Sequence, residues 1–126
     1  MTDAAQADFG KIADAYIALW NETDAKRRLA LIGEAWTEDA RYVDPLMSGE
    51  GREQISGLIG AVHERFPGFR FSLIGQPDGH GSHVRFSWGL GPVGQDSPIR
   101  GTDFAVVEGE RLQSVTGFLD QVPAGA

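Results

Sequence analysis

The sequence has no cysteine and few basic residues. None of its 126 residues is cysteine, which excludes disulfides, thiolate catalysis and cysteine-ligated zinc. The sequence has 11 Lys and Arg but 18 Asp and Glu, so its formal net charge is −7. This charge argues against nucleic acid and anionic membrane surfaces as partners. No apolar run reaches the roughly 18 residues of a membrane span. Because residues 1–8 also lack the pattern of a signal peptide, we expect a cytoplasmic protein.

Apolar residues are plentiful. Hydrophobic side chains make up 41% of the sequence and aromatic ones 10%, so a substantial core is expected. A chain of this length buries about two-thirds of its unfolded surface when it folds. We therefore expect a single domain spanning residues 1–126.

The helix-like patterns come first along the chain. Apolar residues recur at helical spacing over residues 8–21, 24–36 and 51–66. The basic residues 26–28 are expected to be solvated, and they are too few to suggest a nucleic-acid patch. His63 flanks the apolar stripe of the third helix, where a rim position is the common case.

Strand-like patterns dominate the second half. One earlier strand is predicted over 40–46, and alternating apolar residues predict later ones over 69–74, 83–90, 99–107 and 111–119. Residues 76–81 read as a turn, and residues 91–98 as a loop long enough to form a rim. Helices followed by antiparallel strands predict an α+β domain.

We expect the three helices to pack on one face of a curved, mostly antiparallel sheet. Such an arrangement would enclose a conical apolar cavity, the usual kind of site for a small molecule. The residues expected to line this cavity and bind a substrate are Trp20, Trp36, Ile59, Phe66, Trp88 and Phe118.

Asp44 is the first candidate for chemistry. It ends the predicted strand 40–46 and precedes Pro45, which interrupts strand pairing. A carboxylate at a strand end, beside apolar residues, is suitably placed for a general base. An Asp-Pro pair also occurs simply as turn chemistry, so both interpretations stay open.

Asp103 is the second candidate. It lies in the middle of the predicted strand 99–107, where both faces are mostly apolar. A carboxyl in such surroundings either finds a partner or keeps its proton. The alternatives are a salt bridge, with Arg85 or Arg100 as partner, and a neutral acid that donates a hydrogen bond.

Tyr16 on the first helix completes a possible constellation with Asp44 and Asp103. A phenol and a neutral carboxylic acid could together hold a developing enolate oxygen, while a separate carboxylate moves a proton on carbon. No metal or organic cofactor would be needed. A core tyrosine with a satisfied hydroxyl is the alternative for Tyr16.

The chain resembles the nuclear-transport-factor-2-like (NTF2-like) superfamily and, within it, the branch of SnoaL-like polyketide cyclases and ketosteroid isomerases. Five stretches carry the resemblance, which covers roughly residues 8–120: residues 15–21, 35–45, 51–55, 101–104 and 117–120. The resemblance implies that Asp44 is the catalytic base and that Tyr16 and Asp103 form the oxyanion hole. Ketosteroid isomerase is itself the known case of a buried Asp that stays neutral and donates a hydrogen bond.

The sequence departs from that branch on the third helix. The supporting tyrosine of the family falls about at Ile59 in this chain. The hydrogen-bond network around Tyr16 is therefore expected to be different.

Three functions are compatible with these patterns. The first is an isomerase or cyclase that moves a proton next to a carbonyl of a small apolar molecule. The second is a non-catalytic domain that binds a hydrophobic ligand, and the third is a dimerisation module. The resemblance implies a homodimer, and an apolar outer face of the sheet would need cover.

Overall fold

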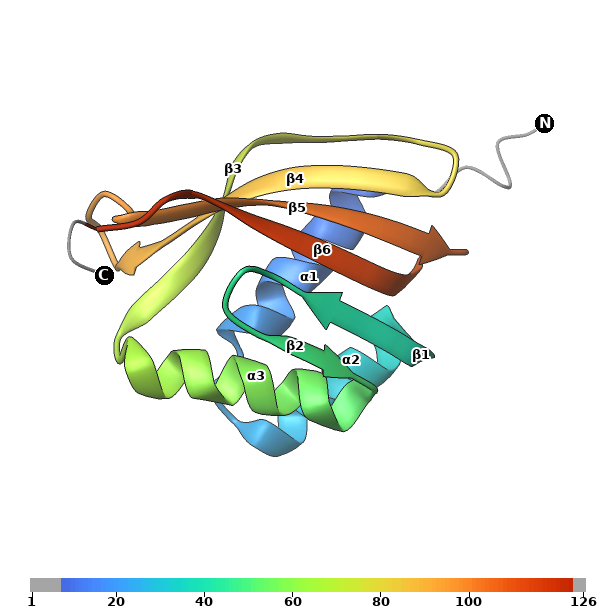
Figure 1. Ribbon diagram of the computed structural model, residues 1–126, viewed down its shortest axis with the longest axis horizontal. Coiled ribbons are helices and arrows are strands. Elements are labelled where there is room, and N and C mark those ends of the chain that lie inside the picture. The colour runs from blue at the N-terminus through green and yellow to red at the C-terminus, as the bar shows by residue number, and fades with distance from the viewer. Residues whose placement is uncertain (1–7, 124–126) are drawn as a thin grey trace.

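The computed structural model describes residues 8–123. It contains three helices and six strands, shown in Figure 1. In chain order these are α1 (Phe9–Asn21), α2 (Ala25–Ala35), β1 (Trp36–Val43), β2 (Ser48–Glu50), α3 (Arg52–Arg65), β3 (Phe69–His80), β4 (His83–Pro92), β5 (Ile99–Glu108) and β6 (Arg111–Gln121).

The strands form one open sheet in the order β2-β1-β6-β5-β4-β3. β1 runs parallel to β6, and the other neighbours are antiparallel. The predicted α+β class with a mostly antiparallel sheet is therefore confirmed. The parallel pair matters for function because it places the end of β1 beside the middle of β6.

Local sequence explains where the helices begin. The side chain of Asp8 accepts a hydrogen bond from the backbone N–H of Lys11, and Asp24 does the same for Arg27. These are N-caps, which satisfy donors that the first turn leaves free. The second helix ends earlier than predicted, since Trp36 already belongs to β1.

Two strands are longer than predicted. β3 continues through residues 76–80, which were predicted to form a turn, and the pairing with β4 shifts register between Ile74 and Asp78. Gly75 lies in this bulge with a φ of 71°, a conformation that glycine adopts without strain. β4 reaches Pro92, so the expected rim loop is shortened.

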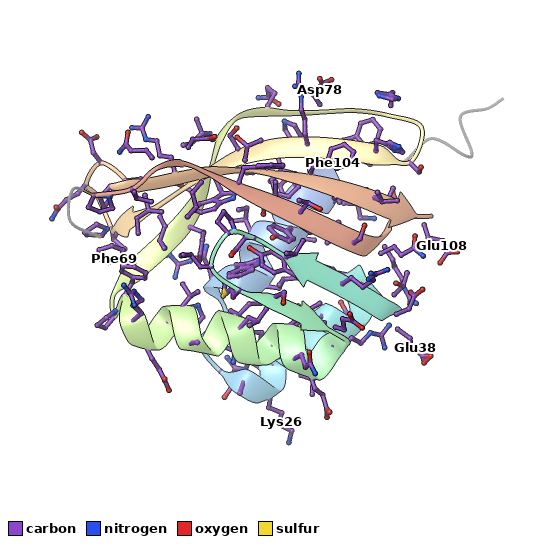
Figure 2. All side chains as sticks on the ribbon, in the orientation of Figure 1. Lys26, Glu38, Phe69, Asp78, Phe104 and Glu108 are labelled. Carbon is purple, nitrogen blue, oxygen red and sulfur yellow. The ribbon has the colours of Figure 1, made fainter. Side chains whose placement is uncertain are left out.

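Helices α1 and α3 pack against different strands of the sheet. α1 packs against β3 and α2, whereas α3 packs against α2, β1 and β2, as Figure 1 shows. Lys26 points into solvent as expected (Figure 2). Arg28 does not: it is buried between helices, where it donates to the Ser56 hydroxyl and the Glu22 carbonyl. Over residues 8–123, no helix is both long and apolar enough to cross a membrane.

Candidate active site

A tyrosine and an aspartic acid meet inside the domain. Tyr16 lies on the apolar face of α1, and the alternation of β5 turns Asp103 to the covered face of the sheet. Each side chain is only 2% exposed. The Tyr16 hydroxyl lies 2.6 Å from Asp103 Oδ2, a short distance typical of a charge-assisted or acid–phenol hydrogen bond. We call these two residues the Tyr16–Asp103 pair.

Trp88 is the second partner of Asp103. Its indole Nε1 donates to Asp103 Oδ1 over 3.0 Å. The salt bridge considered for Asp103 is wrong: Arg85 pairs with Asp78 instead, at 3.2 Å, and Arg100 lies on the exposed face of β5. Within residues 8–123, Asp103 therefore has neutral donors and no ion-pair partner.

Burial controls the ionisation of the pair. Loss of hydration raises the pKa of Asp103 from 3.8 to about 6, although the hydrogen bonds from Tyr16 and Trp88 pull the pKa down. The nearby charges of Asp44 and Asp120 raise it further. Burial, together with the Asp103 charge, also raises the pKa of Tyr16 well above its ordinary value. Asp103 thus changes protonation state near pH 6 while Tyr16 stays neutral.

Asp44 lies just past the end of β1, in the turn that leads to β2. Its Oδ1 accepts hydrogen bonds from the backbone N–H groups of Leu46 and Met47, at 2.8 and 2.9 Å. Its Oδ2 accepts one from the Tyr42 hydroxyl at 2.6 Å. A carboxylate has about four lone-pair positions, so one position on Oδ2 remains available to take a proton. The turn interpretation and the base interpretation are both compatible with this geometry.

Tyr42 is a site residue that the sequence reasoning missed. It is 5% exposed and precedes Asp44 by two positions, so the two side chains lie on the same side of the strand. Burial raises the pKa of Tyr42, and the negative charges of Asp103 and Asp44 add to the effect. The phenol therefore stays protonated as a donor. The i, i+2 spacing of Tyr42 and Asp44 was the available signal.

The two carboxyl groups approach each other across Gly117 on β6. Gly117 pairs with Asp103 on β5, and β1 runs parallel on the other side. A Cβ atom on Gly117 would lie 2.9 Å from Asp103 Oδ1, 3.2 Å from Asp44 Cβ and 3.3 Å from the Tyr42 hydroxyl. The absence of a side chain at Gly117 thus leaves room for these three groups to converge.

Aromatic rings fill the space beside these polar groups. The Trp20 ring lies 5.2 Å from the Phe71 ring and 5.5 Å from the Tyr42 ring, and Phe71 lies 5.4 Å from Trp88. Figure 2 shows side chains packed between the sheet and the helices. Four residues of the expected cavity lining are buried in this core: Trp20, Trp36, Ile59 and Trp88.

The other two expected lining residues lie elsewhere. Phe66 follows α3, is half-buried and stacks on Phe69 at 5.3 Å. Phe118 is 55% exposed because strand alternation turns it to the opposite face from Gly117. Its expected place in the lining is therefore wrong.

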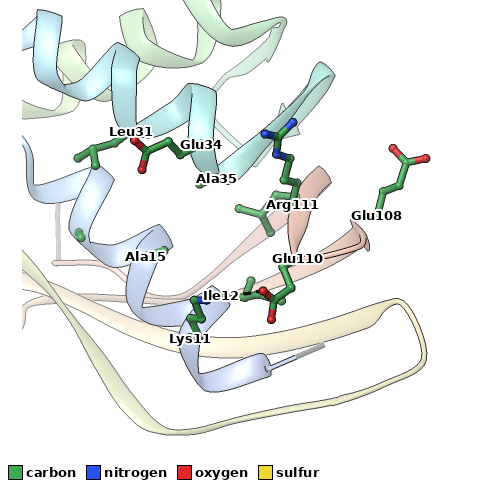
Figure 3. A pocket seen from close by; sticks show the side chains of 11 residues that line it. Lys11, Ile12, Ala15, Leu31, Glu34, Ala35, Glu108, Glu110 and Arg111 are labelled. Atoms are coloured by element: carbon green, nitrogen blue, oxygen red, sulfur yellow. Dashed lines mark ion pairs between the residues drawn. The ribbon is translucent and has the colours of Figure 1, made fainter. Parts of the chain in front are cut away.

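Two surface hollows lie away from Tyr16, Asp44 and Asp103. One, of about 540 Å³, lies between α1, α2 and the β5–β6 hairpin (Figure 3), and its charged residues include Lys11, Glu34 and Arg111. The other, of about 730 Å³, lies over β1, β2 and β6. Neither is lined by Tyr16, Asp44 or Asp103.

His63 does not belong to the candidate site around Tyr16, Asp44 and Asp103. His63 Nε2 lies 2.6 Å from the carbonyl oxygen of Trp20, so this histidine ties α3 to the end of α1. In the described part of the chain, no three His, Asp or Glu side chains gather in a way that could hold a metal ion.

Three helices and an open, mixed sheet of six strands are the fold of small NTF2-like α+β proteins. Solved structures agree. A candidate ketosteroid isomerase from Kribbella flavida has a TM-score of 0.67 at 18% identity, covering 94% of this chain and 82% of its own. A candidate SnoaL-like polyketide cyclase from Jannaschia has a TM-score of 0.67 at 13% identity, covering 95% and 90%. At these identities the likeness shows the fold alone.

Within that class, the chain belongs to the SnoaL-like family, whose domain model matches residues 13–115. A solved structure with higher identity points the same way. It is a candidate isomerase of the SnoaL-like family from Agrobacterium tumefaciens, 50% identical, with a TM-score of 0.83, covering 87% of this chain and 95% of that one. No curated protein sequence matches the chain.

Proposed function

We propose that this protein is a cofactor-free enzyme of the isomerase or cyclase type, which moves a proton alpha to a carbonyl of a small apolar molecule. The observation that carries the proposal is the Tyr16–Asp103 pair, a buried acid and phenol 2.6 Å apart with a second carboxyl across Gly117. Two carboxyls whose surroundings differ are the usual sign of divided acid and base roles.

Asp44 is the proposed base. In the first step its free Oδ2 position takes a proton from the carbon next to the carbonyl. The electrons of the broken C–H bond form a carbon–carbon double bond, and the carbonyl oxygen gains the negative charge. Protonated Asp44 then returns the proton, to the same carbon or to one further along the conjugated system, and is restored as a carboxylate. A positioned base of this kind contributes typically 10²–10⁴-fold to the rate.

The Tyr16–Asp103 pair is the proposed oxyanion hole. Donors placed where negative charge develops stabilise the transition state more than the ground state. Only the neutral form of Asp103 has a proton to share, and the pKa near 6 makes that form abundant in mildly acidic solution. Binding of a carbonyl that becomes anionic would favour this protonated form further.

An apolar substrate follows from the surroundings of the pair. The nearest neighbours are aromatic, with Tyr16 5.0 Å from the Phe86 ring and 6.0 Å from the Trp20 ring. Trp20, Trp36, Ile59 and Trp88 are the residues proposed to surround a bound substrate, together with the half-buried Phe66.

The packing of buried aromatic rings beside the Tyr16–Asp103 pair supports one alternative. If no substrate reaches this pair, the domain is a non-catalytic binding or dimerisation module and Asp44 serves only its turn. The same experiment distinguishes the two functions. Replacing Asp44 lowers the rate of proton transfer if Asp44 is the base, and it has no such effect if Asp44 only stabilises the turn.

The test is a panel of unsaturated cyclic ketones, with formation of the conjugated product followed by ultraviolet absorbance. We expect wild type to convert at least one member and Asp44→Asn to lose at least 100-fold of the rate. Asp39→Asn is the matched control, since it removes an exposed carboxylate from the same strand. Full activity in Asp44→Asn, or no conversion of any ketone, favours the non-catalytic alternative.

We also propose that the protein is a homodimer formed through the outer face of its sheet. This outer face carries four exposed apolar residues, Val43, Ile74, Phe104 and Phe118, which are 46%, 39%, 40% and 55% exposed, respectively. Residues paired across the strands bring them together, because Phe118 lies beside Thr102 and Phe104 beside Thr116. A second copy of the same face would cover this surface.

A further inference from the structure

Trp88 holds one oxygen of Asp103 in a way that depends on the chemistry of indole. Its Nε1 lies 3.0 Å from Asp103 Oδ1, and both residues are more than nine-tenths buried. An indole N–H can donate a hydrogen bond but cannot accept one. Oδ1 must therefore present a bare lone pair to Trp88, whether Asp103 is charged or neutral.

This constraint decides where the proton of neutral Asp103 resides. With Oδ1 committed as an acceptor, the proton belongs on Oδ2, the oxygen 2.6 Å from the Tyr16 hydroxyl. The pair then has two O–H groups and one mutual hydrogen bond, so one O–H is left for a ligand. When Asp103 is ionised, the single proton of Tyr16 is used by Asp103, and the pair has no donor left.

The absence of a side chain at Gly101 leaves room for the indole ring of Trp88. It is paired with Trp88 across β4 and β5. A Cβ on Gly101 would overlap the Trp88 ring and lie 2.6 Å from the Phe118 carbonyl oxygen. The ring therefore lies against this glycine, and it forms an edge-to-face pair with the Phe71 ring at 5.4 Å. These contacts leave Trp88 little freedom to withdraw its N–H from Asp103.

We propose that Trp88 is a positioning residue that places the proton of neutral Asp103 on Oδ2, so that the Tyr16–Asp103 pair presents one O–H donor to a substrate carbonyl. The inference rests on the proposed function, because it describes how the same site is prepared. It adds a role to Trp88 beyond apolar contact. The role acts through Asp103 and needs no direct contact with the reacting atoms.

Other groups near Asp103 do not compete for this role. The titratable neighbours are Tyr16, Tyr42, Asp44 and Asp120, and within residues 8–123 none of the basic residues pairs with Asp103. Tyr42 gives its proton to Asp44. Asp44 and Asp120 act only through their charge, which raises the pKa of Asp103. Trp88 is thus the donor that distinguishes the two oxygens.

The first experiment uses the unmodified protein and no substrate. Each of the three tryptophans gives one indole N–H signal in a ¹⁵N-labelled NMR spectrum. We expect the Trp88 signal to move downfield as Asp103 loses its proton near pH 6, because a charged acceptor strengthens the bond. The Trp36 signal is the internal control, since its buried Nε1 has no hydrogen-bond partner in the part of the chain that the structure describes. A Trp88 signal that ignores the ionisation of Asp103 overturns the proposal.

The second experiment removes the donor. In Trp88→Phe, the pKa of Asp103, followed by carboxyl ¹³C NMR, should rise by about 1 because a hydrogen bond to the charged form is lost. The infrared C=O band of neutral Asp103, identified by difference from Asp103→Asn, should move to higher frequency because its carbonyl oxygen becomes free. Trp36→Phe is the matched control for the lost ring volume, and it should change neither signal.

An unchanged pKa and C=O band in a folded Trp88→Phe overturns the inference. If that variant does not fold, the wild-type titration still decides. Both measurements are independent of turnover. Failure of the ketone assay would therefore leave this inference standing as a property of the acid, and failure of the titrations would leave Asp44 as base untouched.

Discussion

At the scale of single residues, Asp103 is the most informative group. It is buried with two neutral donors, and no cation of residues 8–123 pairs with it. A salt bridge would have kept it ionised, whereas hydrogen bonds from Tyr16 and Trp88 allow both protonation states. The position in a strand made burial predictable, but the partners come from residues 87 and 15 positions away.

The raised pKa of Asp103 predicts a stability effect. Between pH 3.8 and about 6 the folded protein binds the proton more tightly than the unfolded chain does. Stability therefore falls as the pH rises through this window, and the loss is complete above it. The difference of about 2 in pKa corresponds to about 3 kcal/mol of unfolding free energy.

Asp103→Asn should remove this loss. Its amide oxygen can accept from Trp88 while its NH₂ donates to Tyr16, so the variant keeps both contacts. Urea unfolding at pH 4 and pH 7 is expected to show that Asp103→Asn gains about 2 kcal/mol relative to wild type between the two values, because the unfolded Asp is already partly ionised at pH 4. Parallel pH profiles for the two proteins would contradict the raised pKa.

Asp44 allows turn and base roles to be separated. Asp44→Asn can still accept both backbone N–H groups of the turn, so its stability should stay near that of wild type. Asp44→Ala leaves the N–H groups of Leu46 and Met47 without their acceptor and should lose about 1–2 kcal/mol in urea unfolding. Equal stability of the Asn and Ala variants would show that the turn does not need this side chain.

At the scale of elements, β6 joins two halves of the site. It is hydrogen-bonded to β1 on one side and to β5 on the other. Gly117 is the position where the two neighbouring carboxyls approach. The strand was predicted from alternation alone, but the sequence does not reveal that its neighbour on one side is parallel. Only that pairing brings Asp44 next to Asp103.

Gly117→Ala should disturb this junction. The new methyl would lie 2.9 Å from Asp103 Oδ1, so we expect a loss of about 1–3 kcal/mol in thermal or urea unfolding, typical of overpacking. Gly57→Ala is the control, because nothing lies within 4 Å of a Cβ there on helix α3. It should gain up to about 1 kcal/mol from helix propensity. A Gly117→Ala variant as stable as wild type would contradict the close approach.

At the scale of the whole molecule, the sheet has one covered and one open face. On β5, residues alternate strictly between buried and less buried positions. The covered face carries the Tyr16–Asp103 pair, and the outer face carries Phe104 and Phe118. The proposed catalytic and dimer surfaces are therefore back to back on the same strands.

The outer face predicts an assembly test. We expect wild type, with a 13.6 kDa chain, to sediment as a dimer at tens of micromolar. The double variant Phe104→Asp, Phe118→Asp should sediment as a monomer because it places charges in the interface. Val93→Asp is the control, an exposed apolar residue outside the outer face. A monomeric wild type would contradict the proposed dimer.

The sequence by itself determined most of the elements and their order, although no pattern predicted β2 and residues 76–80 were expected to form a turn. Helical spacing placed Tyr16 on the apolar side of α1, and alternation placed Asp103 within a strand whose two faces are both mostly apolar. These features depend on neighbours within a few positions, where the backbone geometry of helices and strands sets the period. The resemblance to the SnoaL-like branch implied site roles for Tyr16, Asp44 and Asp103.

Only the tertiary structure decided what those residues contact. The parallel pairing of β1 with β6, the indole of Trp88 on Asp103, the Tyr42 bond to Asp44 and the aromatic filling of the interior all join distant segments. Such contacts follow from the register of the sheet and the packing of the helices against it. A local pattern carries no information about either, because side chains far apart in sequence meet only once the chain has folded.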